Sequence, residues 1–300
     1  MYCITTKNLS YRFNGQDTVL SDIELAVPKA SIYGFLGPNG AGKTTTLRLL
    51  LGLLKKQTGS IQFFEKDFEE NRLSILRKTG SLIEAPSIYA HLSASENLAL
   101  LQKIYRCDKN RIAEVLKLVG LEHTGKKSAG KFSLGMKQRL SIAIALMHEP
   151  ELLILDEPTN GLDPNGIIEI RELLKKLNQE QGLTILISSH LLAEIEKMVT
   201  HVGIINKGKL IFQGTMQSLH EAQQQQSVIY FETNNLPATK NILQAAGLPA
   251  VEYEKGLRIQ LTEPDKVALV NTQLVEQGIA VYQISVIKND LESIFMDLIK

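Results

Sequence analysis

The sequence predicts an α/β protein with a large first unit and a small second α/β unit. Over about the first 215 residues, short apolar runs of strand length alternate with longer stretches of helical periodicity, as in α/β sheet proteins. Four consecutive glutamines, Gln223 to Gln226, interrupt this pattern, which restarts after them. The 300 residues also exceed what one compact module usually needs. We therefore expect domains at 1–220 and 228–300, joined by a linker at 221–227.

Each expected strand of the first unit is a short run rich in apolar or β-branched residues, and each expected helix is a longer run with apolar residues three and four positions apart. The run 31–36 leads into a glycine-rich turn, and the run 152–155 is apolar throughout. The expected strands are 4–9, 23–27, 31–36, 61–64, 78–83, 152–155, 184–188, 202–206 and 209–212. The expected helices are 42–54, 93–118, 165–181 and 191–198.

The second unit repeats this alternation on a smaller scale. Two of its expected helices end at a glycine, and two of its strands are positioned to pair across a short turn at 254–256. The expected strands are 228–231, 251–253, 257–261 and 279–286, and the expected helices are 238–246, 266–276 and a last one carrying Leu291, Ile294, Phe295 and Leu298 on one face. No motif in this unit indicates a chemistry.

The charge balance excludes a strong electrostatic attraction to polyanions. Lys and Arg total 33 and Asp and Glu total 32, which gives a formal net charge of +1. A chain this close to neutrality has no overall attraction for DNA, RNA or anionic lipid, so we do not expect nucleic acid as a partner.

The low cysteine content and the short apolar runs lead us to expect a cytoplasmic chain. The two cysteines, Cys3 and Cys107, are too few for a disulfide framework. The N-terminus lacks the apolar core of a signal peptide. The longest apolar runs, 49–54 and 140–147, are far shorter than the roughly 20 residues that a spanning helix needs. We therefore expect a chain that does not cross a membrane by itself.

A phosphate-binding loop is the strongest motif. Residues 37–44 read G-P-N-G-A-G-K-T and match G-x-x-x-x-G-K-[ST] between an expected strand and an expected helix. Glycines allow the backbone N–H groups to surround phosphate oxygens, and the start of the helix favours the same anion. Lys43 would reach the β- and γ-phosphates of ATP, and the Thr44 hydroxyl would bind Mg²⁺. The expected phosphate-binding residues are Gly37, Pro38, Asn39, Gly40, Ala41, Gly42, Lys43, Thr44 and Thr45.

A pair of acids follows the apolar run 152–155. Strands of α/β sheets deliver the residues at their carboxyl ends to the ligand-binding crevice. Asp156 is therefore the expected partner of Mg²⁺, and Glu157 is the expected general base that polarises the attacking water. Two adjacent acids could instead be an ordinary exposed turn, but that reading is weak beside a phosphate-binding loop.

These motifs, with others further along, make residues 1–215 resemble the nucleotide-binding subunit of ATP-binding cassette (ABC) transporters. Residues 132–136 look like the family signature L-S-G-G-Q, keeping Ser133 and Gly135 and departing at the other three positions. Residues 160–163 resemble the D-loop, and residues 188–190 resemble the motif that ends in the switch histidine. The resemblance implies a P-loop NTPase fold of the ABC type, with a mixed sheet and a helical subdomain.

The resemblance also implies roles for single residues. Tyr11 matches the aromatic residue that stacks on adenine, and His190 would contact the γ-phosphate and help to hold the attacking water. Ser133 and Gly135 would bind the γ-phosphate held by a second protomer, although Ser133 is also a plausible simple helix cap. A homodimer, or a dimer with another ATPase protomer, would therefore sandwich two ATP molecules.

Glu84 follows the expected strand 78–83, where the family pattern normally has glutamine. A carboxylate keeps an oxygen for water or Mg²⁺, loses the N–H donor and adds negative charge near the γ-phosphate. Glutamate here is similar to a subgroup that exports lantibiotic and bacitracin-type antimicrobial peptides. The alternative is that Glu84 lies in a solvated loop.

The leading interpretation is thus the cytosolic ATPase subunit of an antimicrobial peptide exporter, bound to the inner face of the membrane through a separate ABC-2-type permease. That permease, and not this chain, would bind the exported compound. The alternatives are the ATPase of another drug exporter or of an importer, a soluble ABC protein without a transport role, and a nucleotide-binding switch without hydrolysis. Intact Lys43, Asp156, Glu157 and His190 argue against the last of these.

Overall fold

The computed structural model describes residues 1–13, 18–84, 88–226 and 228–287. The chain divides into two compact units, Met1–Met216 and Gln217–Lys300. The division falls at the start of helix α8 (Met216–Gln226), so a helix covers the segment that we expected to be a linker, as far as Gln226. None of the helices in the described ranges combines the length and the apolarity that a membrane span requires.

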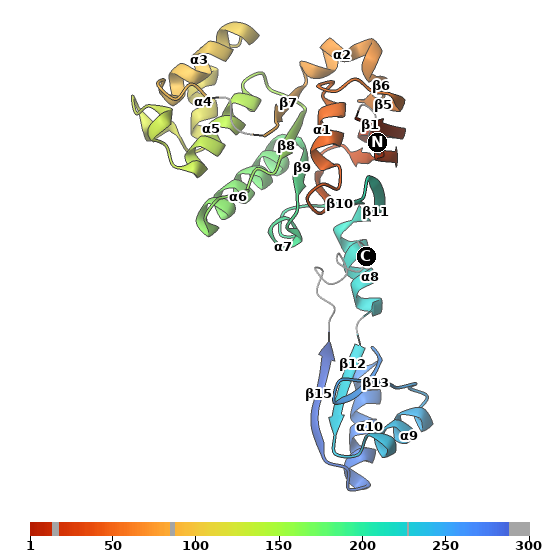
Figure 1. Ribbon diagram of the computed structural model, residues 1–300. Coiled ribbons are helices and arrows are strands. Elements are labelled where there is room, and N and C mark those ends of the chain that lie inside the picture. The colour runs from red at the N-terminus through yellow and green to blue at the C-terminus, as the bar shows by residue number, and fades with distance from the viewer. Residues whose placement is uncertain (14–17, 85–87, 227, 288–300) are drawn as a thin grey trace. The chain divides into compact units, whose positions relative to one another are not determined.

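A six-stranded mixed sheet forms the centre of the first unit, in the order β11-β10-β4-β9-β8-β7 (Figure 1). All neighbouring pairs are parallel except β10 with β11. Every residue of β4, β8 and β9 is buried, which explains their nearly continuous apolar sequences. The strands are β4 (Ile32–Leu36), β7 (Thr79–Leu82), β8 (Leu152–Asp156), β9 (Thr184–Ser189), β10 (His201–Asn206) and β11 (Lys209–Thr215).

A second, antiparallel sheet follows the order β2-β1-β5-β6, with β3 also paired to β1. One prediction here was wrong, because the expected strand 23–27 is divided into the end of β2 and the start of β3. Thr6 of β1 fixes this corner by donating to the Ile23 carbonyl and accepting from the Leu25 amide. The strands are β1 (Tyr2–Arg12), β2 (Thr18–Ile23), β3 (Ala26–Pro28), β5 (Thr58–Phe63) and β6 (Lys66–Asp67).

Helices α3, α4 and α5 gather at one side of the first unit, as expected for a helical subdomain (Figure 1). The single helix expected at 93–118 is two helices, because Arg106 adopts a left-handed conformation (φ 56°) that ends α3. Ser93 and Glu96 form a capping box at its start. The helices are α1 (Lys43–Leu50), α2 (Phe68–Leu76), α3 (Ala94–Tyr105), α4 (Asn110–Leu118), α5 (Leu134–Leu146), α6 (Pro164–Gln181) and α7 (Leu192–Ile195).

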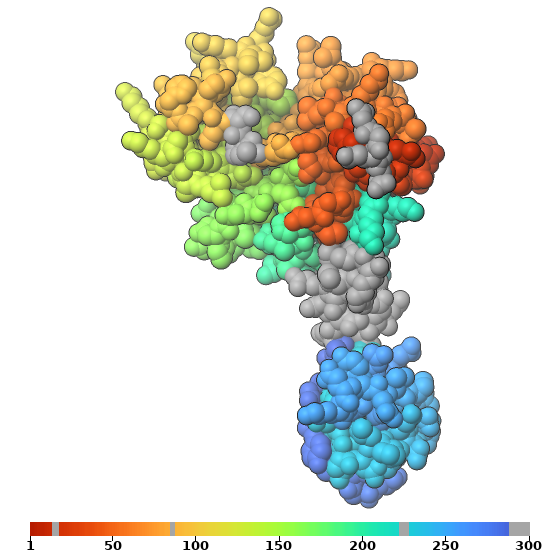
Figure 2. Space-filling view, in the orientation of Figure 1, coloured from red at the N-terminus to blue at the C-terminus, as the bar shows by residue number. Residues whose placement is uncertain are grey.

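The second unit is a β-α-β-β-α-β arrangement whose antiparallel sheet has the order β13-β14-β12-β15. Helices α9 and α10 contribute Leu243, Val270 and Leu274 to its core, which also contains Phe231 and Leu257 of the sheet. In the space-filling view, the side chains of this unit, coloured blue, pack closely on the face that is visible (Figure 2). The helix expected over Leu291–Leu298 lies outside the described residues. The elements are β12 (Val228–Thr233), α9 (Leu236–Ala245), β13 (Val251–Tyr253), β14 (Gly256–Gln260), α10 (Pro264–Glu276) and β15 (Val281–Ile287).

Candidate active site

The expected phosphate-binding loop joins the buried end of β4 to the start of α1. Gly42 caps the helix at φ 108°, a conformation that side chains rarely allow. At Gly37 an added Cβ would lie 2.4 Å from the Ile205 carbonyl oxygen of β10, so only glycine fits this close approach. The loop is therefore shaped by backbone requirements at two glycines that belong to the motif.

Lys43 lies almost fully buried beneath this loop. Its ammonium donates to the carbonyl oxygens of Gly37 at 2.8 Å and Pro38 at 3.3 Å, and it forms an ion pair with Glu157 at 3.3 Å. A buried cation needs such partners, because desolvation makes an unpaired one very costly. Because the Lys43 ammonium lies under the turn, a phosphate group bound in the loop can take the place of the Glu157 carboxylate as its partner.

Thr44 and Asp156 lie next to each other although 112 positions separate them in the sequence. The Thr44 hydroxyl donates to Asp156 Oδ2 at 2.8 Å, and the Ser188 hydroxyl at the end of β9 donates to Oδ1 at 2.5 Å. Ser188 in turn accepts the backbone N–H of Glu157 at 2.9 Å. A hydroxyl and a carboxylate side by side are the oxygen ligands that Mg²⁺ prefers, so the residues present fit this ion.

Glu157 lies directly after β8, where its backbone turns to φ 47°. One carboxylate oxygen lies 3.3 Å from the Lys43 ammonium, and the other lies 2.7 Å from His190 Nδ1. The Glu157 and His190 side chains remain 22% and 31% exposed, so both reach the solvent side of the cluster. The structure thus brings together four residues that the sequence predicted separately: Lys43, Asp156, Glu157 and His190.

A hollow of about 490 Å³ lies over this cluster. A larger hollow of about 620 Å³, lined in part by Arg111, Glu149 and Thr184, holds none of the predicted residues, so size alone does not mark the site. The hollow at the cluster is lined by Val19, Asn39, Gly40, Gly42, Lys43, Thr44, Thr45, Glu157, Asn160 and His190.

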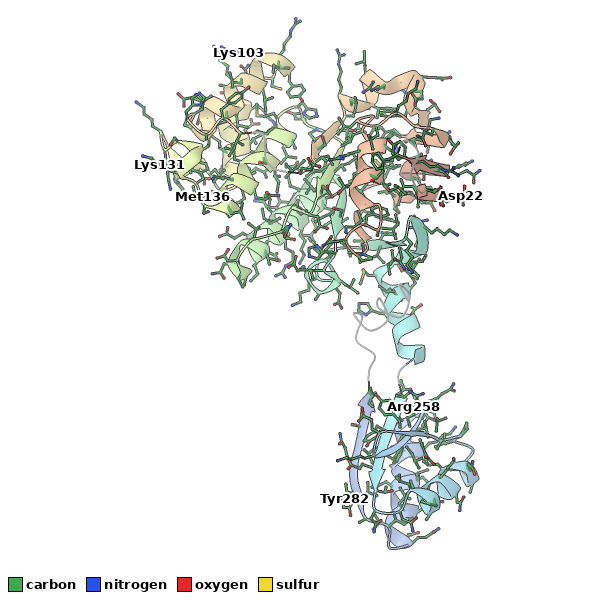
Figure 3. The ribbon with its side chains drawn as sticks, in the orientation of Figure 1. Asp22, Lys103, Lys131, Met136, Arg258 and Tyr282 are labelled. Carbon is green, nitrogen blue, oxygen red and sulfur yellow. The ribbon has the colours of Figure 1, made fainter. Side chains whose placement is uncertain are left out.

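Ser133 and Gly135 lie apart from the loop of their own chain. Ser133 caps α5 by accepting the Met136 N–H at 3.2 Å, which agrees with the alternative that Ser133 is a helix cap. Both residues line a separate hollow of about 480 Å³ that also includes Gly161, Leu162 and Asp163, and Figure 3 shows Met136 at the edge of the helical group. Within one chain, the hollow at the phosphate-binding loop and the hollow at Ser133 and Gly135 are therefore separate. A site that combines the two would need a second chain.

The structure does not bring Glu84 into the cluster, contrary to the expected role at the metal and nucleotide. Its side chain is 60% exposed and forms an ion pair with Arg48 in the last turn of α1, one turn beyond Thr44. The positive charge of Arg48 faces the carboxylate at the surface. The arrangement is nearer to the solvated-loop alternative.

The expected stacking role of Tyr11 does not fit the position of its ring. Tyr11 is 9% exposed and belongs to the core cluster, whereas Phe13 is 38% exposed and contacts Tyr11 edge to face, with 5.1 Å between ring centroids. A buried ring has no free face for adenine. Sequence reasoning missed Phe13, and its only signal was a second aromatic residue two positions after Tyr11, just beyond the end of β1 at Arg12.

Burial displaces the pKa values of Cys3 and His148, which do not line the nucleotide hollow. Burial raises the pKa of the Cys3 thiol to about 12, which fits an inert cysteine packed in the core. Burial also lowers the pKa of His148, whose ring stacks on Tyr105 at 4.5 Å.

Comparison with known proteins identifies the family. A family model described as ABC transporter matches residues 20–160. The bacitracin transport ATP-binding protein BcrA of Bacillus licheniformis is 45% identical over 99% of this chain and 97% of that protein. The chain belongs to the ABC transporter family. It is therefore an ATP-binding, ATP-hydrolysing subunit of a kind that dimerises and works with a membrane permease.

Two further known proteins resemble this ABC subunit over a smaller share of the chain. The lantibiotic transport ATP-binding protein SrtF of Streptococcus pyogenes is 45% identical over 66% of this chain and 85% of that protein. A solved ATP-binding cassette, a dimer in a post-hydrolysis state bound to ADP and Pi, is 25% identical with a TM-score of 0.63, covering 71% of this chain and 98% of that one. The fold predicted from the sequence is confirmed by this structural likeness.

Proposed function

We propose that the cluster around Lys43 and Glu157 is the hydrolytic site and that it works with Mg²⁺. The observation that carries the proposal is the contact of one carboxylate, Glu157, with both the loop lysine and His190. Mg²⁺ bound by Thr44 and Asp156 would supply positive charge to the phosphate oxygens. Lys43 would exchange its ion pair with Glu157 for the β- and γ-phosphates, which frees the carboxylate.

The freed Glu157 would accept a proton from the attacking water. The water oxygen forms a bond to the γ-phosphorus while the bond to the β–γ bridging oxygen breaks, giving ADP and phosphate. His190, 2.7 Å from Glu157, would hold this carboxylate in position and contact the γ-phosphate. Phe13 would offer its exposed ring to the adenine, in the place that we expected for Tyr11.

The second anion site would come from another copy of the chain. Ser133 and Gly135 lie in their own hollow, separate from the loop, so a dimer with its protomers opposed would place them against the partner's γ-phosphate. The start of α5 favours an anion there because its first backbone N–H groups and its dipole point outward.

We further propose that the subunit drives export of bacitracin-type or lantibiotic peptides through a separate ABC-2-type permease at the inner face of the membrane. The support is the likeness to BcrA along almost the whole of both chains, which includes the small accessory unit at 228–300. SrtF, named for lantibiotic transport, supports the same substrate class. The exported compound would contact the permease and not this chain.

A survival panel tests the export proposal in the host cell. Deletion of this subunit is expected to lower the inhibitory concentration of bacitracin or of a lantibiotic several-fold and to leave unrelated small drugs unchanged. Complementation with the wild-type chain should restore growth, and complementation with Glu157→Gln should not. Sensitivity to small drugs alone would instead assign the subunit to another drug exporter, and an unchanged panel would contradict the export proposal.

A further inference from the structure

Thr159 and Glu194 form a hydrogen bond between the two segments that carry the proposed catalytic residues. The Thr159 hydroxyl donates to Glu194 Oε2 at 2.8 Å, across 35 positions of sequence. Thr159 follows β8 and is 4% exposed, and Glu194 lies on α7, which follows β9. Neither residue lines the hollow over the cluster, so the pair does not belong to the site already described.

Thr159 begins the turn that leads to residues 160–163. Its carbonyl accepts the Leu162 N–H at 3.2 Å, and Asn160 donates its N–H to the Glu157 carbonyl at 3.1 Å. Asn160 lines the nucleotide hollow, and Leu162 lines the hollow that contains Ser133. The backbone around Thr159 therefore connects residues that line both hollows with the Glu157 carbonyl.

At the other end of this hydrogen bond, the packing of α7 holds Glu194 in place. Leu192 and Ile195 are buried, and Ile195 lies so close to Gly34 of β4 that an added Cβ there would be 3.0 Å from its Cγ2 atom. Because β4 leads into the phosphate-binding loop, α7 is fixed against the same strand that positions Lys43. Close packing of this kind transmits displacement and does not absorb it.

We propose that Glu194 is a positioning residue, which through Thr159 couples the turn at 160–163 to the segment that carries His190. When a partner or a nucleotide contacts this turn, the hydrogen bond keeps the side chains of Glu157 and His190 in the same position relative to each other. The inference rests on the proposed hydrolysis by these two residues. It adds a role for a pair of side chains that do not line the nucleotide hollow.

The alternative is that the hydrogen bond only stabilises the fold. A structural role would lower the thermal midpoint and leave the turnover of the folded protein unchanged. A positioning role would lower kcat and leave KM for ATP nearly unchanged, because the binding loop is intact. The two roles therefore differ in the kinetic constant that responds.

The test compares Thr159→Val with Thr159→Ser in the full-length chain. Valine keeps the shape and removes the donor, whereas serine keeps the donor. We expect Thr159→Val to lower kcat about tenfold with KM within about twofold, as for misplacement of a catalytic group, and Thr159→Ser to retain most of the wild-type kcat. Equal kcat values for the two variants would overturn the proposal.

Variants of Glu194 provide an independent arm. Glutamine keeps an acceptor oxygen, so Glu194→Gln is expected to retain more activity than Glu194→Ala. The double variant Thr159→Val with Glu194→Ala is expected to be no slower than the slower single variant, because the two changes remove one bond. Multiplied losses in the double variant, or a loss that follows the thermal midpoint alone, would contradict the proposed coupling.

Failure of this inference and failure of the proposed function are distinguishable. If Glu157 is not the base, Glu157→Gln retains normal turnover. If only the coupling is wrong, Glu157→Gln is inactive while Thr159→Val remains as active as Thr159→Ser.

Discussion

Glu157→Gln is expected to lower the turnover of ATP by at least about 100-fold, since general-base catalysis contributes on the order of 10²- to 10⁴-fold. Glutamine keeps the shape of the side chain and can still contact His190, but it cannot take a proton from water. ATP would therefore bind and hold the dimer closed without hydrolysis. Steady-state phosphate release gives the rate, and light scattering with Mg²⁺ and ATP gives the mass of the trapped species.

Glu151→Gln is the matched control for this experiment. Glu151 directly precedes β8 and Glu157 directly follows it, so the two substitutions alter the same chemical group at opposite ends of one strand. Glu151 is 55% exposed and pairs with Lys78 at the surface. Its replacement is expected to change turnover by less than about twofold, as for an exposed ion pair. Normal turnover in Glu157→Gln would remove its assigned role as base.

Lys43→Ala is expected to weaken ATP binding by at least about 100-fold, because charge-assisted hydrogen bonds to phosphate are lost within a partly dry site. Alanine also leaves the Gly37 and Pro38 carbonyls without their donor and leaves Glu157 without its cation. The negative charge of Glu157 would then repel the γ-phosphate. Titration calorimetry with a slowly hydrolysed ATP analogue measures the affinity directly.

Lys103→Ala is the control for the loss of a lysine charge. Lys103 lies in the last turn of α3 at the far side of the helical group (Figure 3), and it does not line the nucleotide hollow. We expect unchanged affinity for this variant. Wild-type affinity in Lys43→Ala would show that the loop does not bind the phosphates in the manner proposed.

Motifs that are continuous in the sequence predicted most of the site. The phosphate-binding loop and the acids after β8 each follow a buried strand, and parallel neighbours in one sheet bring their carboxyl ends together. Lys43, Asp156 and Glu157 could therefore be predicted from these motifs, whereas the role of His190 was predicted only from the resemblance to the ABC family. The hydrogen bond between Thr159 and Glu194 could not, since neither residue belongs to a motif that the sequence made visible.

Local features of the chain explain where the structure differs from the expectations. Strand β1 shifts its register against β2 on both sides of Tyr11 and ends at Arg12, so simple alternation does not show that Tyr11 is buried and Phe13 exposed. Arg106 divides one periodic run into two helices without any glycine or proline to signal the end. Glu84 pairs with Arg48 through a surface contact, which depends on the path of a loop. None of these features has a signature in a single sequence.

The central claim is that each ATP is bound between the loop of one protomer and Ser133 of its partner, and a mixing experiment tests it most directly. Lys43→Ala inactivates the loop, and Ser133→Arg blocks the partner's anion site, so each variant alone is expected to be inactive. A mixed dimer contains one site with both defects and one intact site. We predict that ATPase activity reappears when the two inactive variants are mixed. Persistent inactivity of a mixture shown to contain the mixed dimer would contradict the shared site.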